Sequence, residues 1–539
     1  MKALTAAEMR EVDRLTTERF GIPGLELMEA AGKSVAEVFL EKYRERNARI
    51  PGRVSVLCGK GNNGGDGFVV ARLLKGRVGQ VKVYLFAEPG ELRGDAAKNF
   101  QRWTESGEEV ALVRSETEWV NAWTGVAASE VIVDALLGTG IRGGASGLLA
   151  QVIENVNRFS QDAKAAWPGW IVGVDTPSGL PSDGEAAEGP VLRAHLTVTF
   201  TAPKIGQLVS ADAGSCGALV VREIGTPAAL VEEVGKGKLR WAGPEEFSEI
   251  PLQRAAEAHK GSYGHVLLVA GSVGKTGAAV LCGQAALRGG AGLVTLATPE
   301  PALATIAAAQ AEYMTEALPA TASGTIASEA ARLGGFATLL HGMTVLGIGP
   351  GIGTHPETQE FVRSVVAHAD LPIVLDADGL NAFAGQAEVL SNRKSAHLVM
   401  TPHPGEMARL CGFATPEVQA DRIRIAAEFA GKWNAVVVLK GYHSVIAAPN
   451  GDVFVNTTGN AGLAKGGSGD VLTGLLAALI AQFGARDLYR VVALGTYLHG
   501  LAAELVSVES DESGVLAGEV ARALPAARRK LMRELQARG

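Results

Sequence analysis

Short apolar segments rich in Val, Ile and Leu recur along most of the chain, and each ends in Gly, Asp or Pro before a stretch with helical apolar spacing begins. Strands of this kind are typical of parallel sheets covered by helices on both faces, because neither face of the strand meets water. The segments expected as strands are residues 53–59, 81–87, 130–138, 170–179, 196–204, 265–272, 292–299, 345–351, 373–379, 397–406, 435–441 and 443–449. The alternation restricts the fold to the α/β class with mainly parallel sheets.

A charged segment at 225–255 separates these strands into two groups and contains Pro227, Pro244 and Pro251. A chain of 539 residues is also longer than one typical domain. We therefore expect two domains, residues 1–225 and 226–539, each with helices on both faces of its sheet. In such folds ligands bind at the carboxyl ends of the strands.

Composition argues against several classes of protein. A net charge of −7 and only 5% aromatic residues do not indicate a basic or aromatic surface that binds nucleic acid. No apolar run approaches the roughly 18 residues of a membrane span, and the N-terminus lacks the apolar core of a signal peptide. The four cysteines are widely spaced, which indicates neither a disulfide framework nor a zinc site. The sequence predicts a cytoplasmic protein that binds neither nucleic acid nor membrane.

The segment 459–474, GNAGLAKGGSGDVLTG, is the most informative for chemistry. Its glycines lead into a strongly apolar helix, and a helix N-terminus with close backbone approach is an anion site. A carboxylate at that point repels phosphate, so Asp470 is better explained as a base that takes a proton from a hydroxyl about to meet a phosphoryl group. The alternative is a glycine-rich turn that Asp470 merely caps.

The first half carries a second glycine loop. Residues 59–64 satisfy GxGxxG after a strand and before a helix, which raises the possibility of a dinucleotide-binding dehydrogenase. We disfavour that interpretation, because Asn62, Asn63 and Asp66 add polar side chains that a loop binding pyrophosphate through its backbone N–H groups does not need. A P-loop is excluded in the second half, since Val269 stands where the motif needs glycine.

Acids also end two strands of the first half. Asn63, Asp134 and Ser178 could meet at one sheet edge and offer oxygen ligands to a hard cation, or each could cap its own turn. Asp175 is the preferred acid/base, because an acid that ends a strand beside two phosphate-type loops would face the ligand. Lys204 could pair with an anionic substrate or be a surface lysine.

Four segments of the first half, NNGGDG, VDALLGTGIRG, DTPSG and TFTAPKIG, resemble the NAD(P)H-hydrate epimerases in that order over about residues 1–225. The resemblance implies potassium bound through Asn63, Asp134 and Ser178. It also implies that the hydrated nicotinamide nucleotide contacts Asn62, Asn63, Gly64, Gly65, Asp66, Gly138, Thr139, Gly140, Ile141, Arg142, Gly143, Gly144 and Asp175.

The second half resembles the ribokinase-like superfamily, and within it the ADP-dependent NAD(P)H-hydrate dehydratases, over about residues 255–505. The segments that carry this resemblance are GSVGKTGAA, LGIGPGIG, DADGLN, TPHPGEM, LKGYHSVI and GNAGLAKGGSGD. The resemblance implies a nucleotide site at Lys440, Gly441, Tyr442, His443, Ser444 and Gly469, and a substrate pocket at Ala278, Gly351, His403 and Asp470. His403 could instead be a hydrogen-bonded turn residue between Pro402 and Pro404.

Together these resemblances imply an N-terminal Rossmann-like αβα sandwich that epimerises the R and S forms of NADHX and NADPHX. They imply a C-terminal ribokinase-like αβα domain that dehydrates the S form at the expense of ADP, giving AMP and phosphate, with Mg²⁺ accompanying the nucleotide. A homo-oligomer is expected. The alternatives are a ribokinase-type small-molecule kinase with a regulatory first half, and a nucleotide-binding scaffold without turnover.

Overall fold

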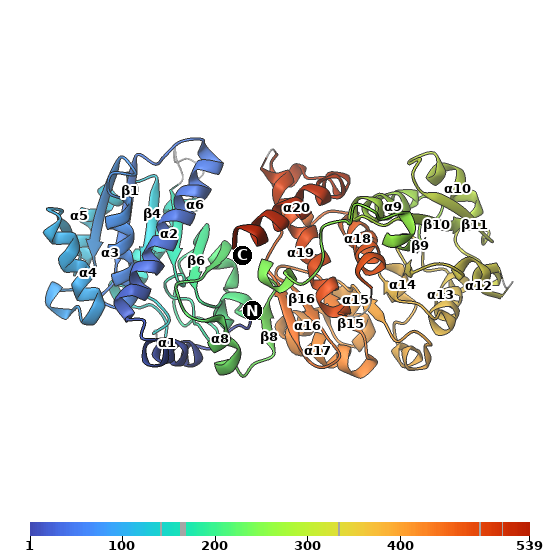
Figure 1. The fold of residues 1–539 in the computed structure, drawn as a ribbon, viewed down its shortest axis with the longest axis horizontal. Helices are drawn as coiled ribbons and strands as arrows, with labels where there is room; N and C mark the ends of the chain where they lie inside the picture. The colour runs from blue at the N-terminus through green and yellow to red at the C-terminus, as the bar shows by residue number, and fades with distance from the viewer. Residues whose placement is uncertain (141–142, 162–168, 333–334, 485–486, 509, 539) are drawn as a thin grey trace. The chain divides into compact units, whose positions relative to one another are not determined.

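The protein is described by a computed structural model that covers residues 1–140, 143–161, 169–332, 335–484, 487–508 and 510–538. It divides into two compact units, Met1–Gly237 and Lys238–Gly539, each built around its own sheet (Figure 1). The first unit extends beyond residue 225 because helix α8 (Ala228–Val234) packs on helix α1 (Ala6–Phe20), with Leu230 and Val231 against Val12 in a small apolar cluster.

The first unit contains a seven-stranded sheet in the order β3-β2-β1-β4-β5-β6-β7, and every neighbouring pair is parallel. Its strands are β1 (Arg53–Cys58), β2 (Gln80–Leu85), β3 (Val110–Leu112), β4 (Val131–Ala135), β5 (Trp170–Val174), β6 (Leu196–Phe200) and β7 (Ala218–Arg222). The chain order reverses between β1 and β4. The loops that leave these two strands therefore diverge and open a crevice at their carboxyl ends.

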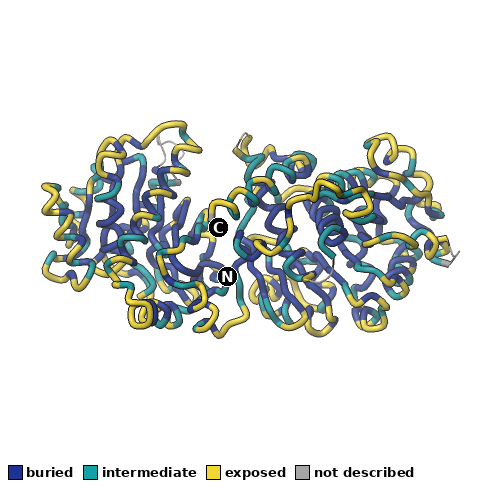
Figure 2. The backbone as a smooth tube through the Cα atoms, viewed as in Figure 1, coloured by how far each residue is buried: buried dark blue, intermediate teal, exposed yellow. Residues whose placement is uncertain are grey.

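Helices cover both faces of this sheet. Along β1, Val54 and Val56 face a cluster with α2, α3 and α4, whereas Leu57 faces a cluster with α5 and α6. This alternation buries both faces of the strand, which appears dark blue inside the unit in Figure 2. The helices are α1, α2 (Gly24–Asn47), α3 (Asn62–Leu74), α4 (Gly94–Glu105), α5 (Glu116–Ala127), α6 (Gly147–Gln161), α7 (Ile205–Val209) and α8.

The second unit contains a ten-stranded sheet in the order β11-β10-β9-β12-β13-β14-β15-β16-β17-β8. It is parallel except that β16 runs antiparallel to both of its neighbours. The strands are β8 (Leu239–Trp241), β9 (His265–Val269), β10 (Leu293–Pro299), β11 (Met314–Leu318), β12 (Val345–Ile348), β13 (Ile373–Leu375), β14 (Leu398–Met400), β15 (Val436–Leu439), β16 (Ser444–Ala447) and β17 (Val453–Asn456). The order reverses between β9 and β12, again at a possible ligand crevice.

The second sheet is also covered on both faces. One cluster contains α9, α10, α18, α19 and α20 with Val266 and Leu268 of β9, and the other contains α13, α15 and α17 with Leu267 and Val269. The prediction of two mainly parallel α/β domains is confirmed. The helices are α9 (Thr276–Gly289), α10 (Glu300–Ala307), α11 (Glu329–Arg332), α12 (Gly335–Leu340), α13 (Pro356–His368), α14 (Asp378–Asn381), α15 (Pro404–Cys411), α16 (Thr415–Ala420), α17 (Arg422–Trp433), α18 (Ser468–Phe483), α19 (Leu488–Ser507) and α20 (Ala517–Arg538).

Helix α18 owes its position to its composition. Nearly all of its side chains are apolar, and those from Val471 to Ala481 are buried between α9, α19 and the sheet. A helix that is apolar on all sides is stable only when neighbours surround it. None of the helices in the described ranges has the length and apolar composition that crossing a membrane requires.

Candidate functional sites

The first unit has a cavity of about 750 Å³ at the carboxyl ends of its central strands. Its walls include Gly59–Asn63 after β1, Leu136–Gly140 after β4, Asp175 after β5 and Thr201 after β6. The cavity therefore lies at the reversal of strand order, where an α/β sheet is expected to bind its ligand.

The glycine loop after β1 passes directly into α3, which begins at Asn62. A Cβ atom at Gly64 would lie 1.9 Å from the carbonyl oxygen of Gly59, so no side chain fits there and the loop folds tightly onto the helix N-terminus. Asp66 is buried in the same turn and also faces the cavity. Its pKa is raised well above the usual range, first by desolvation and then by the nearby carboxylate of Asp175.

Asn63, Asp134 and Ser178 lie together at this edge of the sheet. Asp134 is fully buried. Its carboxylate accepts hydrogen bonds from the Ser178 Oγ–H at 2.5 Å and from the Ser178 backbone N–H at 2.8 Å. The Asn63 amide nitrogen donates to the carbonyl of Leu137 at 2.9 Å. The Asn63 Oδ1 atom is buried and has no hydrogen-bond partner among the residues that the structure describes.

These contacts leave an incomplete oxygen cage. Burial raises the pKa of Asp134 to about 6 despite the hydrogen bonds from Ser178. A carboxylate that is costly to ionise and an amide oxygen without a donor are both satisfied by a cation, and oxygen donors suit a hard cation. The residues present therefore fit a bound alkali or alkaline-earth ion.

Asp175 lies in the cavity wall with a left-handed backbone, at φ 60°. This conformation is strained for a residue with a side chain and persists only where the surroundings hold it. Its Oδ1 atom accepts hydrogen bonds from the Lys204 ammonium and from Thr199 Oγ1 at 2.9 Å. Lys204 is only 2% exposed, so its interpretation as a surface lysine is wrong.

The predicted substrate contacts divide into three groups. Asn62, Asn63, Asp66, Gly138, Thr139, Gly140 and Asp175 line the cavity. Gly64 and Gly65 are buried within α3, and Gly143 and Gly144 lie beside Glu188 and Gly189 rather than in the cavity wall. Ile141 and Arg142 lie outside the described residues. Asp13 of α1 also lines the cavity, although it belongs to none of the motifs that indicate the site.

In the second unit Asp470 lies in the first turn of α18, directly after the glycine loop. It is half-buried, and its pKa is raised to about 6 by desolvation and by the negative charge of Asp376, against the opposing effect of Lys440. An acid with this pKa is mostly ionised at neutral pH and still binds a proton more readily than an ordinary aspartate. This combination suits a general base.

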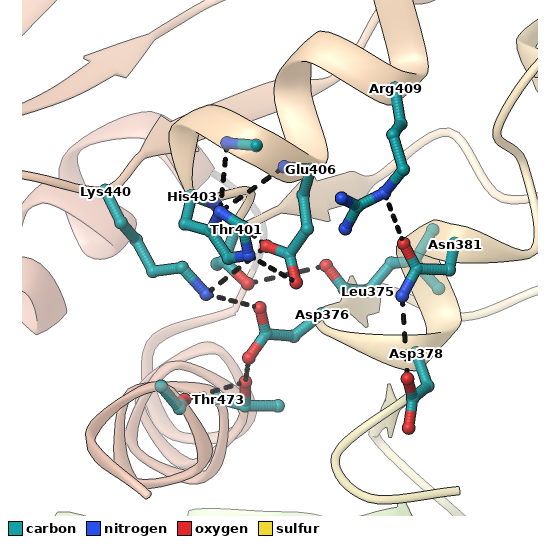
Figure 3. A network of polar contacts seen from close by, with 12 residues as sticks. Leu375, Asp376, Asp378, Asn381, Thr401, His403, Glu406, Arg409, Lys440 and Thr473 are labelled. Atoms are coloured by element: carbon teal, nitrogen blue, oxygen red, sulfur yellow. Dashed lines mark hydrogen bonds and ion pairs between the residues drawn. The ribbon is translucent and has the colours of Figure 1, made fainter. Parts of the chain in front are cut away.

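Lys440 follows β15, and its side chain points toward Asp376 (Figure 3). Its ammonium donates to Asp376 Oδ1 at 2.8 Å and lies 3.9 Å from Glu406 Oε2. Burial alone lowers the pKa of Lys440, but the carboxylates of Asp376 and Glu406 outweigh it and the pKa is raised. A Cβ atom at Gly469 would lie 3.3 Å from this ammonium, so Gly469 and Lys440 are close neighbours.

His403 is the N-cap of α15. Its Nδ1 atom accepts hydrogen bonds from the backbone N–H groups of Gly405 at 3.0 Å and Glu406 at 3.3 Å, and Glu406 returns the contact to the His403 N–H. This is a reciprocal capping box. The ring remains 52% exposed at the same edge as Lys440, so the role of a turn residue and that of a ligand contact are compatible (Figure 3).

The remaining predicted residues lie around this centre. Tyr442 and His443 stack in the hairpin turn between β15 and β16, with ring centroids 4.1 Å apart, between Gly441 and Ser444. Tyr442 is exposed, and its backbone carbonyl accepts a hydrogen bond from the Arg422 guanidinium. A Cβ atom at Gly351 would lie 2.7 Å from Ala278 Cβ, so these two residues are in contact across the β9–β12 reversal.

Two further acids at this site, Asp376 and Asp378, belong to the segment DADGLN and were not predicted as site residues. Asp376 binds Lys440, and Asp378 forms an ion pair with Lys275 at 3.1 Å and accepts from the Gly353 N–H at 2.9 Å. Their position directly after β13, at the same strand ends as the other loops, is the signal that could have found them. Among the described residues no group of three His, Cys, Asp or Glu side chains is arranged as a metal centre.

Two family models match this chain. The model described as YjeF-related protein N-terminus matches residues 24–206. The model described as NAD(P)H-hydrate dehydratase matches residues 266–526. The two matches fall in different compact units and include most of the residues of the two sites described above.

Full-length relatives are also found. A protein of Moorella thermoacetica named bifunctional NAD(P)H-hydrate repair enzyme is 41% identical over 536 residues, which cover 99% of this chain and 98% of that protein. A protein of the same name from Escherichia coli K12 is 33% identical, covering 96% and 92%. The crystal structure of an ADP/ATP-dependent NAD(P)H-hydrate dehydratase from Bacillus subtilis, co-crystallised with ATP and Mg²⁺, is 33% identical with a TM-score of 0.46, covering 54% of this chain and 98% of that one.

Proposed function

The chain belongs to the family of bifunctional NAD(P)H-hydrate repair enzymes, and on this premise we propose that its two units restore hydrated NADH and NADPH in two steps. The first unit interconverts the R and S epimers, and the second dehydrates the S epimer with ADP. The observation that carries the proposal is that each unit places one acid, Asp175 or Asp470, beside a glycine loop at the carboxyl edge of its sheet.

In the first step the substrate occupies the cavity of the first unit, with its phosphates near the N-terminus of α3. Asp175 moves a proton at the ring hydroxyl, and the lone pair of the ring nitrogen assists loss and return of oxygen at that carbon. Lys204 orients the Asp175 carboxylate through the hydrogen bond to Oδ1. Asn62, Asp66 and residues 138–140 line the space where the nucleotide would lie.

Potassium fits the cage around Asn63, Asp134 and Ser178. The support is the Asn63 Oδ1 atom, which lacks a donor among the described residues, and the buried carboxylate of Asp134. When bound, the ion supplies positive charge that neutralises Asp134 and orders the loops after β4 and β5. The Ser178 hydroxyl donates to Asp134 and accepts from the Leu137 N–H. One lone pair of its oxygen remains for the ion.

In the second step Asp470 removes the proton from the ring hydroxyl, whose oxygen attacks the terminal phosphoryl group of ADP. A C–O–P bond forms, the P–O bond to AMP breaks, and the N-terminus of α18 stabilises charge on the transferred group. The ring nitrogen then expels phosphate, a better leaving group than hydroxide, and forms a C=N⁺ bond. Loss of a proton from the adjacent ring carbon to solvent gives the C=C bond and restores NADH or NADPH. Lys440, Gly469 and residues 441–444 border the nucleotide, and Ala278, Gly351 and His403 border the ring.

Magnesium would enter with the nucleotide, whose phosphates offer the oxygen ligands that this ion prefers. When bound, it supplies charge that offsets the phosphates. The substrates proposed are thus NADHX, NADPHX and ADP. A homo-oligomer and a cytoplasmic location remain predictions, which size-exclusion chromatography with light scattering and cell fractionation would test.

The test follows both epimers of NADHX separately by chromatography and the return of NADH by absorbance. With ADP, Mg²⁺ and K⁺, the wild-type protein should consume both epimers and release AMP and phosphate. Asp470→Asn should stop the return of NADH but still interconvert the epimers, whereas Asp175→Asn should recover the S epimer only. Asp370→Asn, at an exposed aspartate before the opposite end of β13, is the matched control and should behave as wild type.

The outcomes separate this proposal from its alternatives. A phosphorylated product that accumulates would indicate a small-molecule kinase instead. Unchanged nucleotide and unchanged epimers after long incubation would indicate a binding scaffold. If Asp470→Asn and the wild type returned NADH at the same rate, Asp470 would not be the base.

A further inference from the structure

Asp376 has no role in the chemistry proposed above, although it lies at the centre of the second site. It follows β13 directly and is only 1% exposed. Its two oxygens have different partners: Oδ1 accepts from the Lys440 ammonium at 2.8 Å, and Oδ2 accepts from Thr473 Oγ1 at 2.8 Å (Figure 3). A buried carboxylate with both oxygens bound is held in one orientation.

Thr473 connects Asp376 to α18, the helix that carries Asp470. Thr473 lies in α18 one turn after Asp470 and also donates to the Gly469 carbonyl at 3.1 Å. A Cβ atom at Gly469 would lie 3.4 Å from Asp376 Oδ2. The carboxylate of Asp376 therefore packs against the backbone that immediately precedes Asp470.

The charges that face Asp470 are unequal. Asp376 and Asp378 follow β13 and are negative, Lys440 follows β15 and is positive, and the Cys282 thiol of α9 is also within electrostatic reach. Two carboxylates against one ammonium disfavour ionisation of Asp470, in the same direction as its partial burial. A base that binds its proton more strongly, yet remains ionised at neutral pH, is better matched to removing a proton from a hydroxyl.

We propose that Asp376 is a positioning residue for the second step, whose buried negative charge strengthens Asp470 as a base. The inference rests on the proposed function of Asp470. Asp376 acts through its charge and not through contact with substrate. The alternative is that the carboxylate only joins β13, β15 and α18 through its hydrogen bonds.

The two roles predict different results for isosteric variants. Asp376→Asn removes the charge and keeps the shape of the side chain. The positive charge of Lys440 is then opposed by Asp378 only, so Asp470 ionises more readily. The acid limb of kcat/KM for NADHX against pH should therefore move to lower pH by about one unit. Thr473→Val keeps the charge and removes one hydrogen bond, so its acid limb should stay with that of the wild type. A purely structural role would lower the rate of both variants without moving either limb.

A titration that needs no turnover makes the test independent of the proposed function. Carboxyl ¹³C NMR of the full-length protein should show Asp470 titrating near the wild-type acid limb while Asp376 keeps its negative charge. If Asp376 is protonated where Asp470 titrates, or if Asp376→Asn leaves the acid limb in place, the inference is overturned. Should Asp376→Asn fail to fold, Asp376→Glu serves instead. It keeps the charge and changes the hydrogen-bond geometry, so its acid limb should stay with that of the wild type, and a limb that moves overturns the inference. A wild type that returns no NADH would instead contradict the proposed function.

Discussion

Replacing Gly474 by alanine should damage the second site from a distance. Gly474 lies in α18, one turn beyond Asp470, where this helix packs on α9. A Cβ atom at 474 would lie 2.0 Å from the carbonyl oxygen of Cys282 in α9 and 2.9 Å from its carbonyl carbon. Backbone atoms cannot turn away as a flexible side chain would, so the two helices must separate by about 1 Å.

The cost can be set against the ordinary gain of alanine in a helix. Overpacking of this kind costs about 1–3 kcal/mol of the free energy of unfolding, whereas glycine to alanine in a helix interior gains about 1 kcal/mol. We expect a net loss of up to about 2 kcal/mol in the second unit. Because a displacement of about 1 Å can cost about 100-fold in rate, dehydration should fall by about that factor while epimerisation is unchanged.

The matched control is Gly431→Ala in α17, where a Cβ atom would meet only the Pro449 carbonyl oxygen at 3.5 Å, an ordinary contact. This variant should gain up to about 1 kcal/mol and keep both activities. Urea unfolding gives the stabilities, and epimer chromatography with NADH absorbance gives the two rates. If Gly474→Ala is as stable and as active in dehydration as Gly431→Ala, the close approach of α9 and α18 does not position Asp470.

Three further predictions concern charges. The rate of dehydration should fall about tenfold per pH unit below about pH 6, because Asp470, whose pKa is raised to about 6, must be ionised to accept a proton; a flat profile down to pH 5 would contradict this assignment. Lys204→Met should lower the free energy of unfolding of the first unit by about 3 kcal/mol in urea, since it leaves the Asp175 carboxylate without its cation; a change below about 1 kcal/mol would refute the ion pair as a structural element. Replacing K⁺ by N-methylglucamine at equal ionic strength should slow epimerisation in the wild type but not in Asn63→Ala, and an equal response of both proteins would exclude Asn63 as a ligand.

The fold was predictable because its main signal is local. An uninterrupted apolar strand is buried on both faces whichever neighbours it has, so segments such as 53–59 and 265–272 could be recognised one at a time. The edge strands β3, β7, β8 and β11 were missed, since partly exposed residues such as those of 314–318 lack that signal. Strand β17 was missed as well, although its residues are buried. The end of the first unit was placed before α8, because only the packing of Leu230 on α1 assigns that helix to it.

The residues of the two sites also differ in how far the sequence could predict their positions and partners. Asn63, Asp134 and Ser178 could meet at one edge, because they lie at or just beyond the carboxyl ends of β1, β4 and β5, which are neighbours in the sheet. The burial of Lys204 could not be predicted, since it depends on Asp175, far along the chain. The place of Asp376 at a strand end could be predicted, but its partners could not, because Lys440 and Thr473 come from the end of β15 and from α18.

The capping box at the start of α15 determines what His403 can do to a ligand. A ring nitrogen that accepts two backbone N–H groups carries no hydrogen, so the proton of the neutral imidazole resides on Nε2. Nε2 lies 3.5 Å from Glu406 Oε1, so the donor of the ring already faces a carboxylate. A neutral His403 therefore has no unoccupied ring nitrogen with which to remove a proton from a ligand. This agrees with the proposal that Asp470 is the base of the second step.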